Sequence, residues 1–250
     1  MTSEAQDILA NLPKISILIP TYNRRNFLPF ILRNLLIQEY PHKLLQVVIH
    51  DDGEIPLIEN YEEFSSAIKP IKLKYLRNKT KLSIGEKRHR LIHNANNNLV
   101  VFMDDDDLYE PTYISHSFDT LQKNNSGCVG CNKMVFIYPP YTKDDFYALD
   151  CGDNKKLIHE ATLMMTKSWY NKTGGFLHSN KAEGLGLTQS CKLKTISVTN
   201  PLYNMTAVVH GKNTIDKEKF KHEGSKLDPT NISFDEKTTN FIKMVVEAQI

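Results

Sequence analysis

The sequence predicts an α/β protein whose mostly parallel sheet carries helices on both faces. Short, continuous apolar runs rich in β-branched residues alternate with amphipathic helical patterns through about residue 115. Such runs are typical of parallel strands that are buried on both faces. Three of the runs also end directly in polar side chains, and ligands of such sheets bind beyond the carboxyl ends of the strands. These two observations predict both the fold class and the place of a functional site.

The first strand and the first helix come at the start of this pattern. The apolar run Lys14–Pro20 predicts a strand that ends at a turn, residues 21–23. We expect Asn26 to cap the following helix, with Pro29 in the first turn, where proline is tolerated. Apolar side chains at helical spacing then predict the buried stripe of this helix: Phe27, Leu28, Ile31, Leu32, Leu35 and Leu36.

The next two strands differ in their expected burial. Leu45–Ile49 is a mainly apolar run, which predicts a buried strand, and Asp51-Asp52-Gly53 follows it closely. Over residues 71–75 apolar side chains alternate with lysines, and this alternation predicts a half-exposed strand.

A capped helix and a third apolar strand complete the first half. Ser83 and Glu86 have the spacing of a capping box, which predicts a helix that begins there and runs through His93. Leu99–Met103 is apolar throughout and leads into four consecutive aspartates, residues 104–107.

The second half is less regular. Short strands are expected over Lys133–Tyr138, Ala161–Thr166 and Thr195–Thr199, and Ser233 is expected to cap a C-terminal helix that runs through Glu247. Glycines at positions 174, 175, 184 and 186 indicate loops that approach a ligand closely. We interpret residues 1–250 as one domain with two functional halves.

Charge and cysteine content exclude several classes of protein. Lys and Arg number 31 against 29 Asp and Glu, for a net charge of +2, which is too even for a protein that coats nucleic acid or an anionic membrane. No apolar stretch approaches the ~20 residues of a membrane span, and the N-terminal residues lack the apolar core of a secretion signal. A soluble, cytoplasmic protein is therefore expected. Cys128 and Cys131 form a lone CxxC without the second pair that zinc requires, so we expect reduced, mostly buried thiols.

The run of four aspartates indicates a metal site. Adjacent carboxylates raise one another's pKa unless a cation or hydrogen-bond donors compensate, and Mg²⁺ or Mn²⁺ suits carboxylate oxygens. Asp104 and Asp106 would share one face if the extended conformation continued through them. The alternative is a solvated acidic turn.

Arg88 gives an independent indication. It lies on the apolar face of its predicted helix together with Ile84 and Leu91, whereas Lys87 and Arg90 are expected to point away. A buried guanidinium must be paired, and either the aspartates or a bound diphosphate would be a suitable partner. The alternative is that Arg88 snorkels at the edge of the helix.

Polar residues after the other strands describe a nucleotide pocket when they are taken together. Asp51 and Asp52 either close a tight turn or accept hydrogen bonds from a base or a ribose. Tyr22 is either an aromatic residue of a turn or a surface on which a base stacks.

Five blocks of the chain, in this order, resemble family 2 glycosyltransferases of the GT-A fold: ISILIPTYNR, VVIHDDG, IGEKRHRLI, VVFMDDDDLYEP and TGGF. The resemblance covers about residues 14–210. It implies transfer, with inversion, of a sugar from a nucleotide diphosphate donor, usually a UDP-sugar, to an acceptor hydroxyl on a glycan, lipid or protein. It also implies Mn²⁺ or Mg²⁺ as cofactor, a donor half over about residues 14–115, and an acceptor half with the C-terminal helix over about residues 116–250.

The resemblance also implies roles for individual residues. Tyr22 would stack on the nucleobase, Asp52 would bind the N–H edge of that base, and Arg88 would lie near the diphosphate. Asp104 and Asp106 would form the D-x-D pair, and His210 would close over the metal or the phosphates. The expected substrate-binding residues are Thr21, Tyr22, Arg24, Asp51, Asp52, Arg88, Asp104 and Asp105, and the expected metal ligands are Asp104, Asp106 and His210.

The general base is expected at Glu183. The family has a Gly-Glu-Asp-like block shortly after Gly-Gly-Phe, and here Gly184 stands where aspartate is usual. Glu183 is the only carboxylate in that loop, and Glu160 and Asp153 are the alternatives. Two other functions remain open at this point: a nucleotidyltransferase on the same scaffold, and a non-catalytic module that binds a sugar nucleotide or a glycan.

Overall fold

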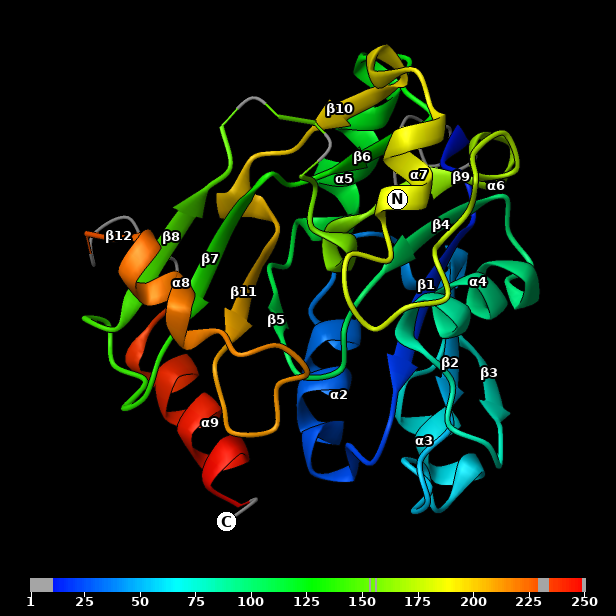
Figure 1. Cartoon of the computed structure of the whole chain (residues 1–250). Helices are drawn as coiled ribbons and strands as arrows, with labels where there is room; N and C mark the ends of the chain where they lie inside the picture. Colours follow the sequence, from blue (N-terminus) through cyan, green and yellow to red (C-terminus); the bar gives the residue numbers. More distant parts are fainter. Residues whose placement is uncertain (1–10, 153, 156, 229–233, 249–250) are drawn as a thin grey trace, which may run out of the picture.

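Two β-sheets with helices packed against them form the structure (Figure 1). The computed structural model describes residues 11–152, 154–155, 157–228 and 234–248. The first sheet has the order β10-β6-β9-β4-β1-β2-β3. Only β9 runs antiparallel to its neighbours β4 and β6, so the prediction of a mostly parallel sheet is confirmed. Its strands are β1 (Ile15–Thr21), β2 (Leu45–Asp51), β3 (Lys72–Arg77), β4 (Leu99–Phe102), β6 (Cys128–Gly130), β9 (Met164–Thr166) and β10 (Ile196–Val198).

Apolar side chains bury the first sheet on both faces. Alternate residues of β1 enter two different clusters: Ile17 and Ile19 belong to one and Leu18 to the other. Helices supply both clusters, which explains why the central strands carry apolar side chains on both faces. The helices are α2 (Leu28–Leu36), α3 (Tyr61–Ala67), α4 (Ile84–Asn94), α5 (Tyr113–Lys123), α6 (Lys167–Tyr170), α7 (Leu185–Ser190), α8 (Glu218–Glu223) and α9 (Glu236–Glu247).

A second sheet, on the left in Figure 1, has the order β12-β8-β7-β11-β5. Helix α9 packs against it, with Ile242 and Val245 in a cluster that also holds Val208 of β11. Among these strands the sequence predicts only β7. Strands β5 and β12 have two residues each, β8 is partly exposed, and Thr206 interrupts the apolar run of β11. The strands are β5 (Leu108–Tyr109), β7 (Lys133–Ile137), β8 (Phe146–Asp150), β11 (Met205–Val208) and β12 (Ser225–Lys226).

Short 3₁₀ turns account for the errors at predicted element boundaries. The strands expected over Ala161–Thr166 and Thr195–Thr199 begin late, because a 3₁₀ turn occupies the first part of each. Asn26 does not cap α2; it lies inside a 3₁₀ turn, and the N-cap residue is Phe27, which makes no side-chain capping bond. The 3₁₀ turns are η1 (Arg25–Phe27), η2 (His42–Leu44), η3 (Glu160–Thr162), η4 (Leu193–Thr195) and η5 (Pro201–Tyr203).

The other two predicted caps have different outcomes. Ser83 caps α4 as predicted, since its side chain accepts a hydrogen bond from the backbone N–H of Glu86. Ser233 lies outside the described residues, and Asp235 caps α9 by accepting from the N–H of Thr238 at 2.8 Å.

The cysteines are free thiols, with Cys128 and Cys131 buried, as the sequence predicts. In the part of the chain that the structure describes, every helix is too short or too polar to span a bilayer.

Candidate active site

A cavity of about 260 Å³ lies beyond the carboxyl ends of β1 and β4. The structure brings eight of the expected residues together in its wall: Thr21, Tyr22, Arg24, Arg88, Asp104, Asp105, Asp106 and Glu183. Asp51, Asp52 and His210 do not line the cavity, although His210 contacts the lining residue Asp106. The end of β2 therefore supports the site without lining it.

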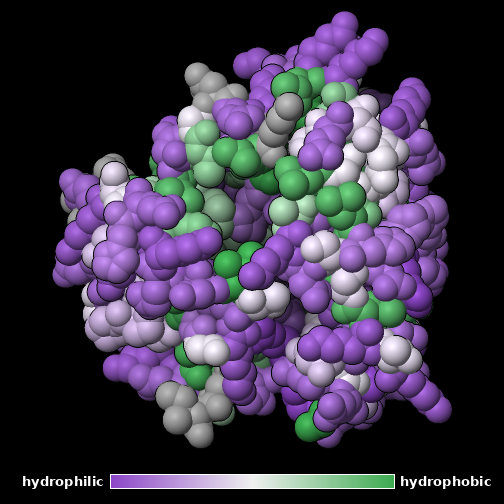
Figure 2. Space-filling model, in the orientation of Figure 1, coloured by the Kyte–Doolittle hydropathy of each residue, from purple (hydrophilic) through white to green (hydrophobic). Residues whose placement is uncertain are grey.

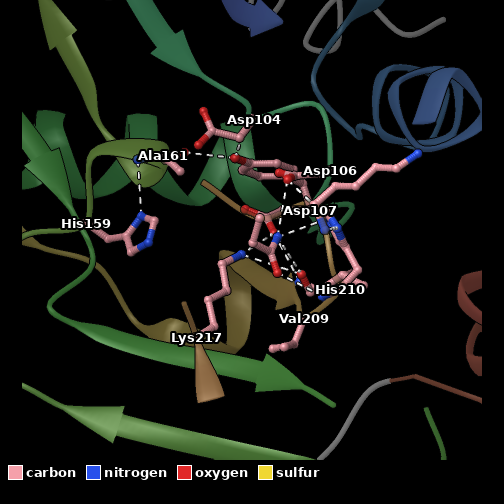
Figure 3. Close-up of polar contacts among 12 residues, drawn as sticks. Asp104, Asp106, Asp107, His159, Ala161, Val209, His210 and Lys217 are labelled. Atoms are coloured by element: carbon pink, nitrogen blue, oxygen red, sulfur yellow. Dashed lines mark hydrogen bonds and ion pairs between the residues drawn. The ribbon is translucent and has the colours of Figure 1, made fainter. Parts of the chain in front are cut away.

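The aspartate run turns instead of continuing β4. The chain leaves the extended conformation and forms a turn at Asp105 and Asp106, so the expected alternation of Asp104 and Asp106 on one extended face is wrong. Tyr109 holds the start of this bend: its hydroxyl accepts from the N–H of Asp104 at 2.7 Å and donates to the carbonyl of Ala161 at 3.0 Å (Figure 3). Both Asp104 and Asp106 still line the cavity.

Asp105 holds a buried carboxylate oxygen that no donor in the described part of the chain satisfies. It is 6% exposed, and its Oδ2 atom has no hydrogen-bond partner among the described residues. Burial and the adjacent Asp106 raise the pKa of Asp105 to about 8. A carboxylate held in this way would be stabilised by a cation.

Asp106 is surrounded by hydrogen-bond donors. Its Oδ2 atom lies 3.2 Å from Nε2 of His210 and 3.5 Å from Nη2 of Arg24 (Figure 3). Burial works to raise the pKa of Asp106, but the His210 hydrogen bond and the charges of Lys217 and Arg24 hold it below its usual range. Burial also lowers the pKa of His210, which favours the neutral imidazole that metals bind.

Asp107 and Lys217 form a pair that sequence reasoning missed. Asp107 Oδ1 accepts from the N–H of Val208 at 3.0 Å, and Lys217 Nζ lies 3.4 Å from the same oxygen (Figure 3). Burial raises the pKa of Asp107 to about 7 even though Lys217 opposes the shift. The pair joins residues 110 positions apart, so no local pattern could have indicated it.

Arg88 is buried and paired, as its position on the apolar face predicts. Its Nη2 atom lies 3.1 Å from the Asp104 carboxylate and its Nε atom 3.1 Å from Glu183 Oε1. Burial works to lower the pKa of Arg88, but the two carboxylates raise it above its usual value. The remaining nitrogen, Nη1, is buried without a hydrogen-bond partner among the described residues.

Lys87 does not point away from the core, contrary to the prediction. It is 5% exposed, and its Nζ atom lies 2.8 Å from Asp52 Oδ1 and 3.0 Å from the carbonyl of Thr21. The long stem of this lysine reaches across from α4 to the ends of β1 and β2. The other oxygen of Asp52 accepts from the N–H of Leu82 at 2.6 Å, so both of its oxygens are engaged within the protein.

The carboxylate of Asp51 closes the turn after β2. It accepts from the N–H groups of Gly53 and Leu57, both at 2.8 Å, and from the Tyr75 hydroxyl and Arg77, both at 2.6 Å. These four donors saturate the carboxylate, and its side chain is 1% exposed.

Replacement of Asp51 by Ala is therefore expected to destabilise the fold. Four donors would lose a buried partner, so the free energy of unfolding should fall by about 3 kcal/mol. Urea unfolding measures this change. The control is Glu59→Ala, which breaks an exposed ion pair with Arg25 and should cost about 1 kcal/mol or less. Unchanged stability together with lost nucleotide affinity would assign Asp51 to the ligand instead.

Tyr22 is half-buried at the cavity wall, beside two lysines. Lys81 Nζ lies 4.0 Å and Lys87 Nζ 5.6 Å from the centre of its ring. These cations place positive charge beside an aromatic surface.

Two glutamates face the cavity from the second half of the chain. The loop that carries Glu183 docks on the start of α4, where the N–H of Gly85 donates to the carbonyl of Ser179 at 3.0 Å. This contact brings Glu183 to Arg88. Glu160, from η3, accepts from the N–H of Gly184 at 3.1 Å. Burial and the nearby Glu183 raise the pKa of Glu160.

Glu160 fills the space beside Gly184. A Cβ atom built on Gly184 would lie 2.7 Å from Glu160 Oε1, which is closer than real contacts allow. Gly184, the position at which the resemblance expects an aspartate, therefore leaves room for a carboxylate from another part of the chain. Asp153, the other alternative base, lies outside the described residues.

The sequence model of the glycosyl transferase family 2 matches residues 16–176. The chain belongs to this family. Among curated relatives, an uncharacterized glycosyltransferase of Rickettsia conorii is 31% identical over 130 residues, which cover 52% of this chain and 19% of the relative. A similar protein of Rickettsia felis is 31% identical over 131 residues, with the same coverage. The match thus spans only about a fifth of the length of these curated relatives.

Solved structures of glycosyltransferases share the GT-A fold of this family 2 chain. Residues 1–349 of S. aureus TarS in complex with UDP match with a TM-score of 0.64 and 17% identity, over 92% of this chain and 69% of that chain. The mannosyltransferase PcManGT from Pyrobaculum calidifontis, in complex with GDP-Man and Mn²⁺, matches with a TM-score of 0.59 and 14% identity, over 96% of this chain and 74% of that chain. The predictions of the family and of the fold class are confirmed.

The residues at the aspartate run fit a divalent cation. Carboxylate oxygens and a neutral imidazole are suitable ligands for Mn²⁺, and Asp105 contributes a buried oxygen without a partner among the described residues. Within those residues, no three acidic, histidine or cysteine side chains are already arranged around one point. Mg²⁺-type sites commonly use only one or two carboxylates and complete the shell with substrate phosphates and water. The aspartate run fits this arrangement, in which one or two carboxylates of the protein act together with substrate phosphates and water.

Proposed function

We propose that this chain transfers a sugar from a nucleotide diphosphate donor, most simply a UDP-sugar, to an acceptor hydroxyl, with inversion and with a divalent cation. One observation carries the proposal. Buried nitrogens of Arg24 and Arg88 and a buried oxygen of Asp105 lack partners among the described residues, and all three side chains line one cavity. Guanidinium nitrogens with free hydrogen-bonding capacity beside a carboxylate oxygen without a donor would suit a diphosphate bound with a metal ion.

The solved neighbours support the choice of donor class. TarS has been solved with UDP and with UDP-GlcNAc, and PcManGT with GDP-Man and Mn²⁺. Tyr22 would stack on the base, and residues 14–115 would hold the nucleotide. The second half of the chain would hold the acceptor.

The proposed reaction is a direct displacement at the anomeric carbon. The acceptor oxygen forms a bond to that carbon while the bond to the β-phosphate oxygen breaks, and the hydroxyl proton passes to a carboxylate of the protein. Arg88 and Arg24 would stabilise the negative charge that develops on the departing diphosphate. A metal ion held by Asp104, Asp106 and His210 would supply further charge stabilisation there.

The acceptor-side base belongs to the Glu160–Glu183 pair. Glu183, the residue expected from the sequence, is held by Arg88 in an ion pair. Burial and the nearby Glu183 raise the pKa of Glu160, and its side chain accepts a hydrogen bond from the backbone N–H of Gly184 and forms no ion pair with another described residue. We therefore propose that Glu160 accepts the proton and that Glu183 positions Arg88. A non-catalytic binding module is less favoured, because Glu160 supplies a carboxylate at the place where the family usually has an aspartate and this chain has Gly184.

A panel of nucleotide sugars tests the function. A ligand present at 100 times its Kd adds about 2.7 kcal/mol of apparent stability, so a cognate UDP-sugar should raise the melting temperature with Mn²⁺ and much less with EDTA. Product analysis should then find UDP. Release of pyrophosphate would identify a nucleotidyltransferase instead, and stabilisation without turnover would identify a binding module.

Replacement of Arg88 by Met tests the diphosphate assignment. Methionine keeps the apolar stem but removes the charge, and a hydrogen bond to a charged group contributes about 1.5–3 kcal/mol. UDP affinity should fall roughly tenfold to a hundredfold, whereas uridine affinity should change little. Calorimetry with both ligands measures the difference. An equal loss for UDP and uridine would mean that Arg88 is only a structural ion pair.

A further inference from the structure

A second cavity, of about 250 Å³, adjoins the donor cavity. The two cavities share His159, Glu160 and Ala182 in their walls. Glu160 therefore stands at the junction, where a group in the second cavity would meet a sugar held in the first.

The wall of the second cavity is mainly apolar. Met134 of β7 and Leu149 of β8 line it from the second sheet, Leu185 and Leu187 line it from α7, and Leu157 lines it as well. Figure 2 shows hydrophobic side chains gathered around a hollow near the centre of the face of the molecule that it draws. Leu157 is 50% exposed. An apolar ligand would remove this surface from water, which is favourable in proportion to the area covered.

The acid and the histidine of the second cavity both lie at the junction. Among its described lining residues, Glu160 is the only acid, and no lysine or arginine lines it. Burial lowers the pKa of His159 to about 4, so this side chain is neutral near pH 7. A bare sugar chain or a phosphate would find few partners deeper in the cavity.

We propose that the second cavity binds the apolar group of the acceptor, a small amphiphilic alcohol whose hydroxyl reaches Glu160. This inference rests on the proposed glycosyl transfer and names the chemical class of its acceptor. An apolar cavity of about 150 Å³ is known to hold benzene, so the second cavity has room for a ring with a short substituent or for a short alkyl chain.

Binding of simple alcohols tests the inference without any sugar transfer. The probe is 4-fluorobenzyl alcohol, observed by ¹⁹F NMR and displaced by unbranched alcohols from 1-butanol to 1-octanol. Burial of one methylene is worth about 0.8 kcal/mol, so each added carbon should bind about fourfold more tightly until the cavity is full. UDP with Mn²⁺ should not displace the probe. An affinity that does not depend on chain length would overturn the inference.

A matched pair of leucine variants locates the binding. Leu157 lines the second cavity and is 50% exposed, whereas Leu202 is 49% exposed on η5 and is not among the residues that line it. Leu157→Asp should weaken the alcohols roughly fivefold, because half of a leucine's burial energy is lost, and Leu202→Asp should leave them unchanged. Equal effects of both variants, or no effect of Leu157→Asp, would place the alcohols elsewhere and overturn the inference.

Nucleotide binding on the same samples separates the two proposals. If UDP binds and the alcohols do not, only the acceptor class is wrong. If UDP does not bind, the donor assignment fails, whatever the alcohols do.

Discussion

Glu160→Gln is expected to reduce sugar transfer by about a hundredfold or more while UDP affinity stays unchanged. Loss of a general base typically costs 10²–10⁴ in rate, that is about a hundredfold at least. Glutamine keeps the shape of the side chain and can still accept from the N–H of Gly184, so the loop should hold its position. Single-turnover transfer at saturating donor, with calorimetry of UDP binding alongside, measures both quantities.

Glu183→Gln is the matched control, because the two glutamates lie side by side and differ in their partners. Glu183 is paired with Arg88, so its neutralisation should disturb the diphosphate site and weaken UDP binding. Glu160→Gln should leave that affinity intact. If Glu183→Gln abolished transfer with unchanged UDP affinity, and Glu160→Gln kept at least a third of the wild-type rate, the base would be Glu183, as the sequence alone suggests.

The pH dependence of the transfer rate is a second test of Glu160 as the general base. A general base must be deprotonated, so activity falls as pH falls through its pKa. Burial and Glu183 raise the pKa of Glu160, which moves this acidic limb to a higher pH than an ordinary glutamate would give. The slow transfer that remains in the Glu160→Gln variant should no longer fall as the pH falls through this range.

The parts of the fold and site that were predictable from sequence are those that a local pattern determines. Strands β1, β2 and β4 are buried on both faces, so their apolar runs identify them almost to the residue. Arg88 was predictable for a related reason: a charge on an apolar helix face requires a partner, and the aspartate run was a suitable one, although the second partner, Glu183, was not foreseen. Ser83 was predictable because a capping box is a fixed spacing.

The missed features depend on distant contacts or on side-chain length. Helical periodicity places Lys87 off the apolar face, but its long, flexible side chain brings the ammonium group to the carboxylate of Asp52. The Asp107–Lys217 pair and the junction at Glu160 join segments that only the folded chain brings together. Asp51 and Asp52 share one motif, yet the structure engages both carboxylates within the protein. Residue type alone does not separate a ligand-binding aspartate from one that closes a turn.

Removal of the Asp106 carboxylate is expected to abolish the effect of metal on UDP binding. In the wild-type protein, UDP should bind much more tightly with Mn²⁺ than with EDTA, because a cation between the carboxylates and the diphosphate offsets the repulsion between them. Loss of even an outer-shell partner typically costs about 10–100-fold in metal affinity. Asp106→Ala should therefore lower UDP affinity in Mn²⁺ at least tenfold and bring it close to the EDTA value.

The control for this experiment is Asp150→Ala, which removes an exposed carboxylate of β8 that pairs with Lys133 away from the cavity. This variant should keep the wild-type response to Mn²⁺. Asp106 also contacts Arg24 and His210, so the Asp106→Ala variant alone does not separate a metal ligand from an organiser of those side chains. The comparison with EDTA does separate them. An organiser would lower UDP affinity by the same factor in Mn²⁺ and in EDTA, whereas a metal ligand lowers it only when the cation is present.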